Sequence, residues 1–265
     1  MGHAGDLRRR LGLPVLVPLL LLTACSAGGG TPADGKPGAS SPAASGPAPT
    51  PSVLDADPAR LPTDRKSAFA LVRQVIANPE SFGPDAVKRT PYESGPDTWP
   101  VLGADCVWQQ AKTPDSVLAT LTRSFELPAA GGKAPLRLAA VVTVHRTRED
   151  ARWEMAESLE ETMRCPAQQL RRDERISSMM SGVLLSGEGA QHTSEDALTE
   201  VGEFHSTELG GPHPYEWQQA QTLQFTVAVT GKGARGRTAD ELSALSSQAL
   251  ATMLARLESA VEKRS

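Results

Sequence analysis

The feature that most constrains the fold is an apolar run near the N-terminus that is too short to cross a membrane. Residues 8–10 are three arginines, and the apolar residues 11–22 follow them directly. A membrane-spanning helix needs about 20 apolar residues, and Pro14 and Pro18 also interrupt the run. A basic segment, a short apolar segment and small residues before a cut site are typical of a secretory signal. We therefore expect residues 1–24 to be removed and not to join the folded domain.

The motif Leu22-Thr23-Ala24-Cys25 ends this run, and it resembles the lipobox of bacterial lipoproteins. In that family the chain is cut directly before the cysteine, whose thiol carries lipid, palmitate included. The resemblance implies that residues 1–24 are a lipoprotein signal peptide and that Cys25 is the lipidation site. The mature protein would then be anchored at the extracytoplasmic face of the cell membrane. The adjacent arginines also fit a twin-arginine signal, so the sequence leaves the export route open.

The charge balance limits the partners of the chain. Its formal net charge is −4, and the expected signal peptide is itself positively charged, so the mature chain is more acidic still. An acidic chain lacks the basic surface with which proteins bind nucleic acid, and an anionic membrane does not attract it. We therefore expect no nucleic-acid partner, and we expect the lipid anchor to provide the contact with the membrane.

Cysteine usage leads to a second expectation about the compartment. The chain has three cysteines, Cys25, Cys106 and Cys165. If Cys25 carries lipid, the other two lie in an oxidising compartment, where a Cys106–Cys165 disulfide is expected. Such a bond would close a loop of about 60 residues and stabilise the fold by about 4 kcal/mol. The alternative is two free thiols, one of them catalytic.

Composition divides the chain into three parts. Residues 26–62 are nearly all Gly, Ala, Ser, Thr and Pro, and such a segment lacks the apolar side chains to form a core. We therefore predict a signal peptide over 1–24, a lipidated cysteine with a disordered linker over 25–62, and one globular domain over 63–265.

The order of predicted elements favours an α+β domain. Apolar spacing predicts three helices and several strands. The helices are expected at about 62–77, 147–164 and 238–263, and the strands at about 106–110, 116–127, 136–146, 175–186, 200–208 and 216–230. Residues 79–104 are rich in Pro, Gly and Asp and are expected to form a loop. Because the strands come in consecutive runs, we predict a largely antiparallel sheet that helices cover on one face. The other face would be solvated or form a cleft.

The helix over 147–164 has two distinct sides in the sequence. Its apolar side is expected to be buried, and it consists of Ala151, Met155, Leu159 and Met163. Its acidic side is expected to be solvated, and it consists of Glu154, Glu157, Glu160 and Glu161.

Three stretches of the domain resemble the extracellular sensor domain of bacterial receptor-type Ser/Thr kinases and its lipoprotein relatives, the PknH-like family. They are Cys106-Val107-Trp108, the strand and helix VTVHRTREDARWEMAESLEETMRC, and the strand and helix FTVAVTGKGARGRTADELSALSSQALATMLARLESA. The family usually has two disulfides, whereas this chain can form one. The resemblance implies a helix-covered antiparallel sheet with a cleft for an envelope ligand, and it transfers no catalytic residue.

Motifs for catalysis and cofactor binding are incomplete in this sequence. No histidine pair has the spacing of metal ligands, and Leu185-Ser186-Gly187-Glu188-Gly189 lacks the first glycine of a serine-hydrolase turn. The glycine-rich, basic residues 231–237 precede a predicted helix, where anions bind readily. A flexible loop between a strand and a helix is the simpler interpretation, because lone glycine patterns are weak signals, and Lys232, Arg235 and Arg237 are the candidate residues if an anion or ligand binds here.

Trp99 is the remaining candidate contact residue, because it lies in the Pro- and Gly-rich loop, and exposed loop aromatics often contact partners. Packing inside the domain is the alternative.

We expect a membrane-anchored lipoprotein that is not an enzyme, carries no metal or cofactor, and binds an envelope ligand or a protein partner. A cell-envelope hydrolase with an unrecognised active site, or a structural lipoprotein, is the alternative.

Overall fold

The structure, a computed structural model, describes residues 54–95, 97–182 and 194–263. The predicted signal peptide, Cys25, most of the expected linker and Leu185–Gly189 lie outside these residues. Within the described ranges no helix combines the length and the hydropathy that a membrane span requires.

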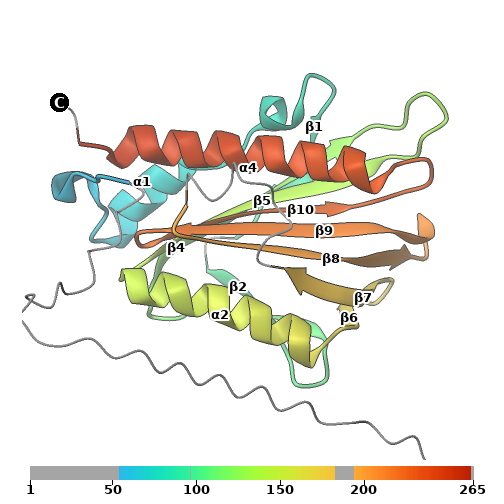
Figure 1. The fold of residues 1–265 in the computed structure, drawn as a ribbon, viewed down its shortest axis with the longest axis horizontal. Coiled ribbons are helices and arrows are strands. Elements are labelled where there is room, and N and C mark those ends of the chain that lie inside the picture. Colours follow the sequence, from blue (N-terminus) through green and yellow to red (C-terminus); the bar gives the residue numbers. More distant parts are fainter. Residues whose placement is uncertain (1–53, 96, 183–193, 264–265) are drawn as a thin grey trace, which may run out of the picture. The chain divides into compact units, whose positions relative to one another are not determined.

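The described residues form one domain built on a large antiparallel sheet (Figure 1). Its eight described strands lie in the order β1-β4-β5-β10-β9-β8-β7-β6. In that order they are Val87–Glu93, Val117–Leu127, Leu136–His145, Phe225–Lys232, Gly210–Thr222, Asp196–Ser206, Glu174–Gly182 and Gln168–Arg171. A separate hairpin pairs β2 (Thr98–Leu102) with β3 (Trp108–Lys112). The helices are α1 (Arg65–Val75), α2 (Arg148–Arg164) and α4 (Ala239–Val261), with short 3-10 turns at Pro58–Arg60 and Pro79–Phe82.

Side-chain caps begin all three of these helices close to the predicted positions. The side chains of Asp64, Thr147 and Thr238 each accept a hydrogen bond from a backbone N–H in the first turn. Asp150 also accepts from the backbone N–H of Thr147, which completes a capping box. These helices and the antiparallel sheet together confirm the prediction of an α+β domain with a largely antiparallel sheet.

The main core lies between the sheet and the helices α1 and α4. The strands β5 and β10 are in register, so that Val142 lies opposite Val227, and both side chains are fully buried. Val72 of α1 and Leu257 of α4 belong to the same apolar cluster. This cluster accounts for the apolar faces that the sequence shows on both helices.

Helices cover both faces of the sheet, so the prediction that one face is covered was wrong. Phe225 and Val227 belong to the core under α1 and α4, whereas the hydroxyl of Thr226 between them donates to Glu154 of α2, at 2.8 Å. Because successive side chains of a strand point to opposite faces, α2 packs on the face opposite α4 (Figure 1). Much of the interface under α2 is polar, and an apolar pattern therefore does not reveal it.

Three boundaries also differ from the predictions. The expected strand 216–230 is a hairpin, in which β9 turns into β10 at Leu223 with φ 51°. The expected loop 79–104 contains β1 and β2. Leu54 is buried in the core, so the folded domain extends into residues assigned to the linker 25–62.

Candidate functional site

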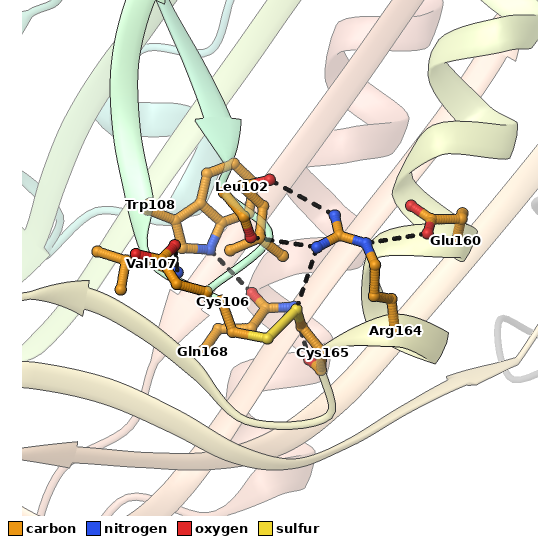
Figure 2. The surroundings of a disulfide bond; sticks show 10 residues. Leu102, Cys106, Val107, Trp108, Glu160, Arg164, Cys165 and Gln168 are labelled. Carbon is orange, nitrogen blue, oxygen red and sulfur yellow. Dashed lines mark hydrogen bonds and ion pairs between the residues drawn. A yellow bond between two sulfur atoms is a disulfide. The ribbon is translucent and has the colours of Figure 1, made fainter.

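A disulfide joins Cys106 and Cys165, with 5.6 Å between their Cα atoms, as predicted (Figure 2). Cys165 ends α2, and Cys106 lies in the turn between β2 and β3 with φ 61°. The bond holds the β2–β3 hairpin against the end of α2. Because both sulfurs are bonded to each other, neither serves as the free catalytic thiol of the alternative hypothesis.

Hydrogen bonds strengthen the same junction (Figure 2). The Arg164 guanidinium donates to the carbonyl oxygens of Leu102 at 3.4 Å and Gly103 at 3.1 Å. The Trp108 indole donates to the Gln168 side-chain oxygen at 2.8 Å. The disulfide, Arg164 and Trp108 together form what we call the clasp, which has a structural role because every one of these polar groups is already engaged.

A polar network lies between α2 and the sheet, and Glu154 is its centre. One carboxylate oxygen of Glu154 lies 2.6 Å from His145 Nε2 and accepts from Thr226, and the other accepts from Gln219 at 3.0 Å. The Ser158 hydroxyl donates to Gln219 at 2.9 Å. The prediction that Glu154 belongs to a solvated acidic side was therefore wrong, because its carboxylate holds the helix on the sheet.

Two further glutamates line the same interface nearer to the clasp. The buried Glu200 of β8 accepts from the hydroxyls of Thr162 at 2.6 Å and Ser181 at 2.8 Å. Burial raises the pKa of Glu200, although both hydroxyls oppose the shift. Burial, reinforced by repulsion from Glu157, raises the pKa of Glu161 to about 7. A carboxyl with this pKa changes its charge near neutral pH.

A pocket of about 410 Å³ opens where the β6–β7 turn meets the β8–β9 turn. We call it the turn pocket. Charged and polar residues dominate its lining, and they include Arg172, Asp173, Arg175, His205, Thr207 and Gly211.

Backbone geometry explains how two distant segments form this pocket. Arg175 of β7 lies directly opposite His205 of β8, so their side chains share one face. The Thr207 N–H donates to the Asp173 carbonyl at 3.1 Å and joins the two turns. Gly211 has φ 145°, and a Cβ there would lie 2.6 Å from the carbonyl oxygen of Phe204. The close approach of β9 to β8 beside the pocket therefore requires glycine at position 211.

The electrostatics of the turn pocket favour anions. Glu174 also lines it, but the Lys232 ammonium at 2.6 Å and the Arg137 guanidinium at 2.8 Å neutralise its carboxylate. Burial by itself would raise the pKa of Glu174, but Lys232, together with the positive charges of Arg171 and Arg137, outweighs it and holds that pKa below its ordinary value. Arg172 and Arg175 form no ion pair within the described residues. Two uncompensated guanidinium groups therefore face this cavity.

The predicted loop cations are not gathered into one site. Lys232 lies at the end of β10, paired with Glu174, and Arg237 donates to Glu241 at 2.7 Å and to the Ala134 carbonyl at 3.0 Å. Arg235 is exposed. Anion binding by this loop stays a prediction, but carboxylates already neutralise two of its three cations.

The exposed aromatic is Trp153 and not Trp99. Trp99 is half-buried on β2, whereas Trp153 of α2 is 66% exposed. Met163, expected in the buried stripe of α2, is 76% exposed. Both differences arise because Glu154 and Thr162 occupy the inward side of this helix.

Sequence reasoning did not find the turn pocket. Its only signals are the basic segment Leu170-Arg171-Arg172-Asp173-Glu174-Arg175 and Gly210-Gly211-Pro212, and neither matches a known motif. No group of three or more metal-ligating side chains occurs in the part of the chain that the structure describes. No protein-family model matches this chain, and no curated protein sequence does either.

Proposed function

We propose that this protein is a lipid-anchored, extracytoplasmic binding protein that takes a ligand in the turn pocket without catalysing a reaction. The observation that carries the proposal is a cavity lined by two guanidinium groups that no carboxylate among the described residues neutralises. A concave site with a few placed polar and charged groups is typical of ligand binding. The β6–β7 and β8–β9 turns would supply the loops for recognition, and the PknH-like resemblance also implies a ligand cleft.

The compartment follows from two independent features of the chain. The motif Leu22-Thr23-Ala24-Cys25 resembles a lipobox, and the Cys106–Cys165 disulfide is a bond that persists in oxidising compartments. Both features support a domain that is held outside the membrane by lipid on Cys25. Membrane contact is then provided by lipid, and an envelope ligand is the expected partner of the domain.

A second function, docking of a protein partner, is favoured by the outer side of α2. Trp153 and Met163 are exposed there, and exposed aromatics are enriched where proteins bind each other. This surface lies on a different element from the turn pocket, so the two functions can be tested separately.

Photo-crosslinking in intact cells tests both functions. A crosslinking amino acid at Thr207, which lines the turn pocket, should capture a ligand. The matched position is Ala156, which is exposed on α2. Capture at Thr207 supports the proposal, whereas capture at Ala156 alone would replace ligand binding with partner docking. Absence of any adduct from Thr207 contradicts the proposed function.

A further inference from the structure

Charged and polar side chains and two glycines line the turn pocket, and they come from the β6–β7 and β8–β9 turns and the strand ends beside them. The side chains include guanidinium groups, carboxylates, hydroxyls and an amide, which offer hydrogen-bond donors and acceptors to a ligand. These groups suit a ligand that is recognised through hydrogen bonds and charge.

Two arginines on adjacent segments determine the charge of that ligand. Arg172 lies in the β6–β7 turn and Arg175 is the second residue of β7, and both line the cavity without a carboxylate partner among the described residues. A planar guanidinium matches the oxygen atoms of phosphate and carboxylate in a bidentate way. The neutralised Glu174 does not oppose such an anion.

The size of the cavity and the position of Asp173 add a second requirement. A volume of about 410 Å³ falls in the range of sites for whole small molecules, so a bare phosphate would leave most of it empty. The exposed Asp173 carboxylate would repel a phosphate but would accept hydrogen bonds from hydroxyl groups. One ligand satisfies both residues if it carries an anionic group at one end and hydroxyls at the other.

We propose that the turn pocket binds a small phosphorylated polyol or sugar, with the phosphate on Arg172 and Arg175 and hydroxyl groups toward Asp173. This inference rests on the proposed function, because it names the ligand class of the same pocket. Gly210 and Gly211 add no side chains to the wall of the cavity, and Thr207 is a further polar residue of its lining.

Isothermal titration of the full chain in detergent micelles tests the ligand class. The probes are glucose 6-phosphate, inorganic phosphate and glucose. We expect glucose 6-phosphate to bind most tightly, inorganic phosphate to bind more weakly, and glucose to show no binding. R175Q and R172Q should each weaken glucose 6-phosphate binding at least about tenfold, because each removes hydrogen bonds to a charged group.

The matched control is R235Q, which removes an exposed arginine from the loop between β10 and α4. It should change the affinity less than about twofold, and circular dichroism should show that all three variants fold. D173N should strengthen the binding of inorganic phosphate, because it removes a like charge. Loss of binding in R235Q but not in R175Q would move the anion site to the loop and overturn the proposal.

Two outcomes separate this inference from the proposed function. If Thr207 captures a ligand in cells but neither phosphate probe binds at millimolar concentration, the ligand class is wrong and the binding function stands. Phosphatidylglycerol vesicles distinguish a lipid headgroup from a soluble phosphate. Arg175-dependent sedimentation of the C25S protein with these vesicles would assign the phosphate to a lipid and contradict a soluble ligand.

Discussion

A single carboxylate connects α2 to three strands of the sheet. Glu154 accepts hydrogen bonds from Thr226 and Gln219 and pairs with His145. All three partners come from different strands, so this one side chain contributes to the packing of α2 on each of them. Removing it would leave buried donors unsatisfied, which costs more than the loss of an exposed hydrogen bond.

We therefore expect Glu154→Ala to lower the free energy of unfolding by about 2–4 kcal/mol, since several buried partners lose their acceptor at once. The control is Glu160→Ala on the outer side of the same helix, where the Arg164 partner is exposed. It should cost less than about 0.5 kcal/mol. Urea denaturation measures both values, and equal losses would show that Glu154 has no special role.

The raised pKa of Glu161 should make the stability of the fold depend on pH. Its pKa is about 7 in the fold and near the ordinary value of 4.5 in the unfolded chain, so the folded state binds more protons between these values. Stability should therefore fall as the pH rises from about 4.5 to about 7. Glu161→Gln should flatten this dependence and raise the melting temperature at pH 8. A wild-type melting temperature that rises over the same window would contradict the assignment.

At the scale of elements, strand pairing and the disulfide determine features of the fold that apolar periodicity does not predict. The helices were predictable because apolar spacing and capping residues are local signals, as at Thr147 and Thr238. The β9–β10 hairpin was not, because Leu223-Gln224 turns without glycine, proline or asparagine and the alternation of apolar residues continues nearby. The pairing of β9 with β8 and of β10 with β5 in the sheet favours a turn here that local propensity does not indicate.

The clasp also acts at this scale. We expect the double variant C106S/C165S to lose about 2–5 kcal/mol of stability. In this variant the β2–β3 hairpin should exchange its amide hydrogens faster than the central strands. Hydrogen exchange followed by mass spectrometry measures this difference. In the wild type, alkylation without reduction should label neither cysteine. Uniform loss of protection across β5 and β10 would show that the disulfide supports the core and not the hairpin.

For the whole molecule, the lipid anchor that we propose on Cys25 leads to a prediction about localisation. We expect the native protein to carry acyl groups on Cys25 and to sediment with membranes, and C25S to appear in the soluble extracytoplasmic fraction, because this domain surface has no other proposed membrane contact. Mass spectrometry of the N-terminal peptide and fractionation measure these outcomes. An unmodified N-terminus that still includes residues 1–24 would contradict the localisation.

The sequence by itself determined the α+β class, the helix starts and the Cys106–Cys165 pairing. Helix caps and apolar periodicity depend only on neighbouring residues, and the small number of cysteines leaves few possible pairings. Only the tertiary structure decided that α2 covers the second face, that Glu154 is an internal partner, and that Arg172 and Arg175 share a cavity with His205. These features depend on the register between β7 and β8 and on polar contacts between distant strands. The sequence pattern around a polar side chain does not show whether that side chain faces water or a buried hydrogen-bond partner.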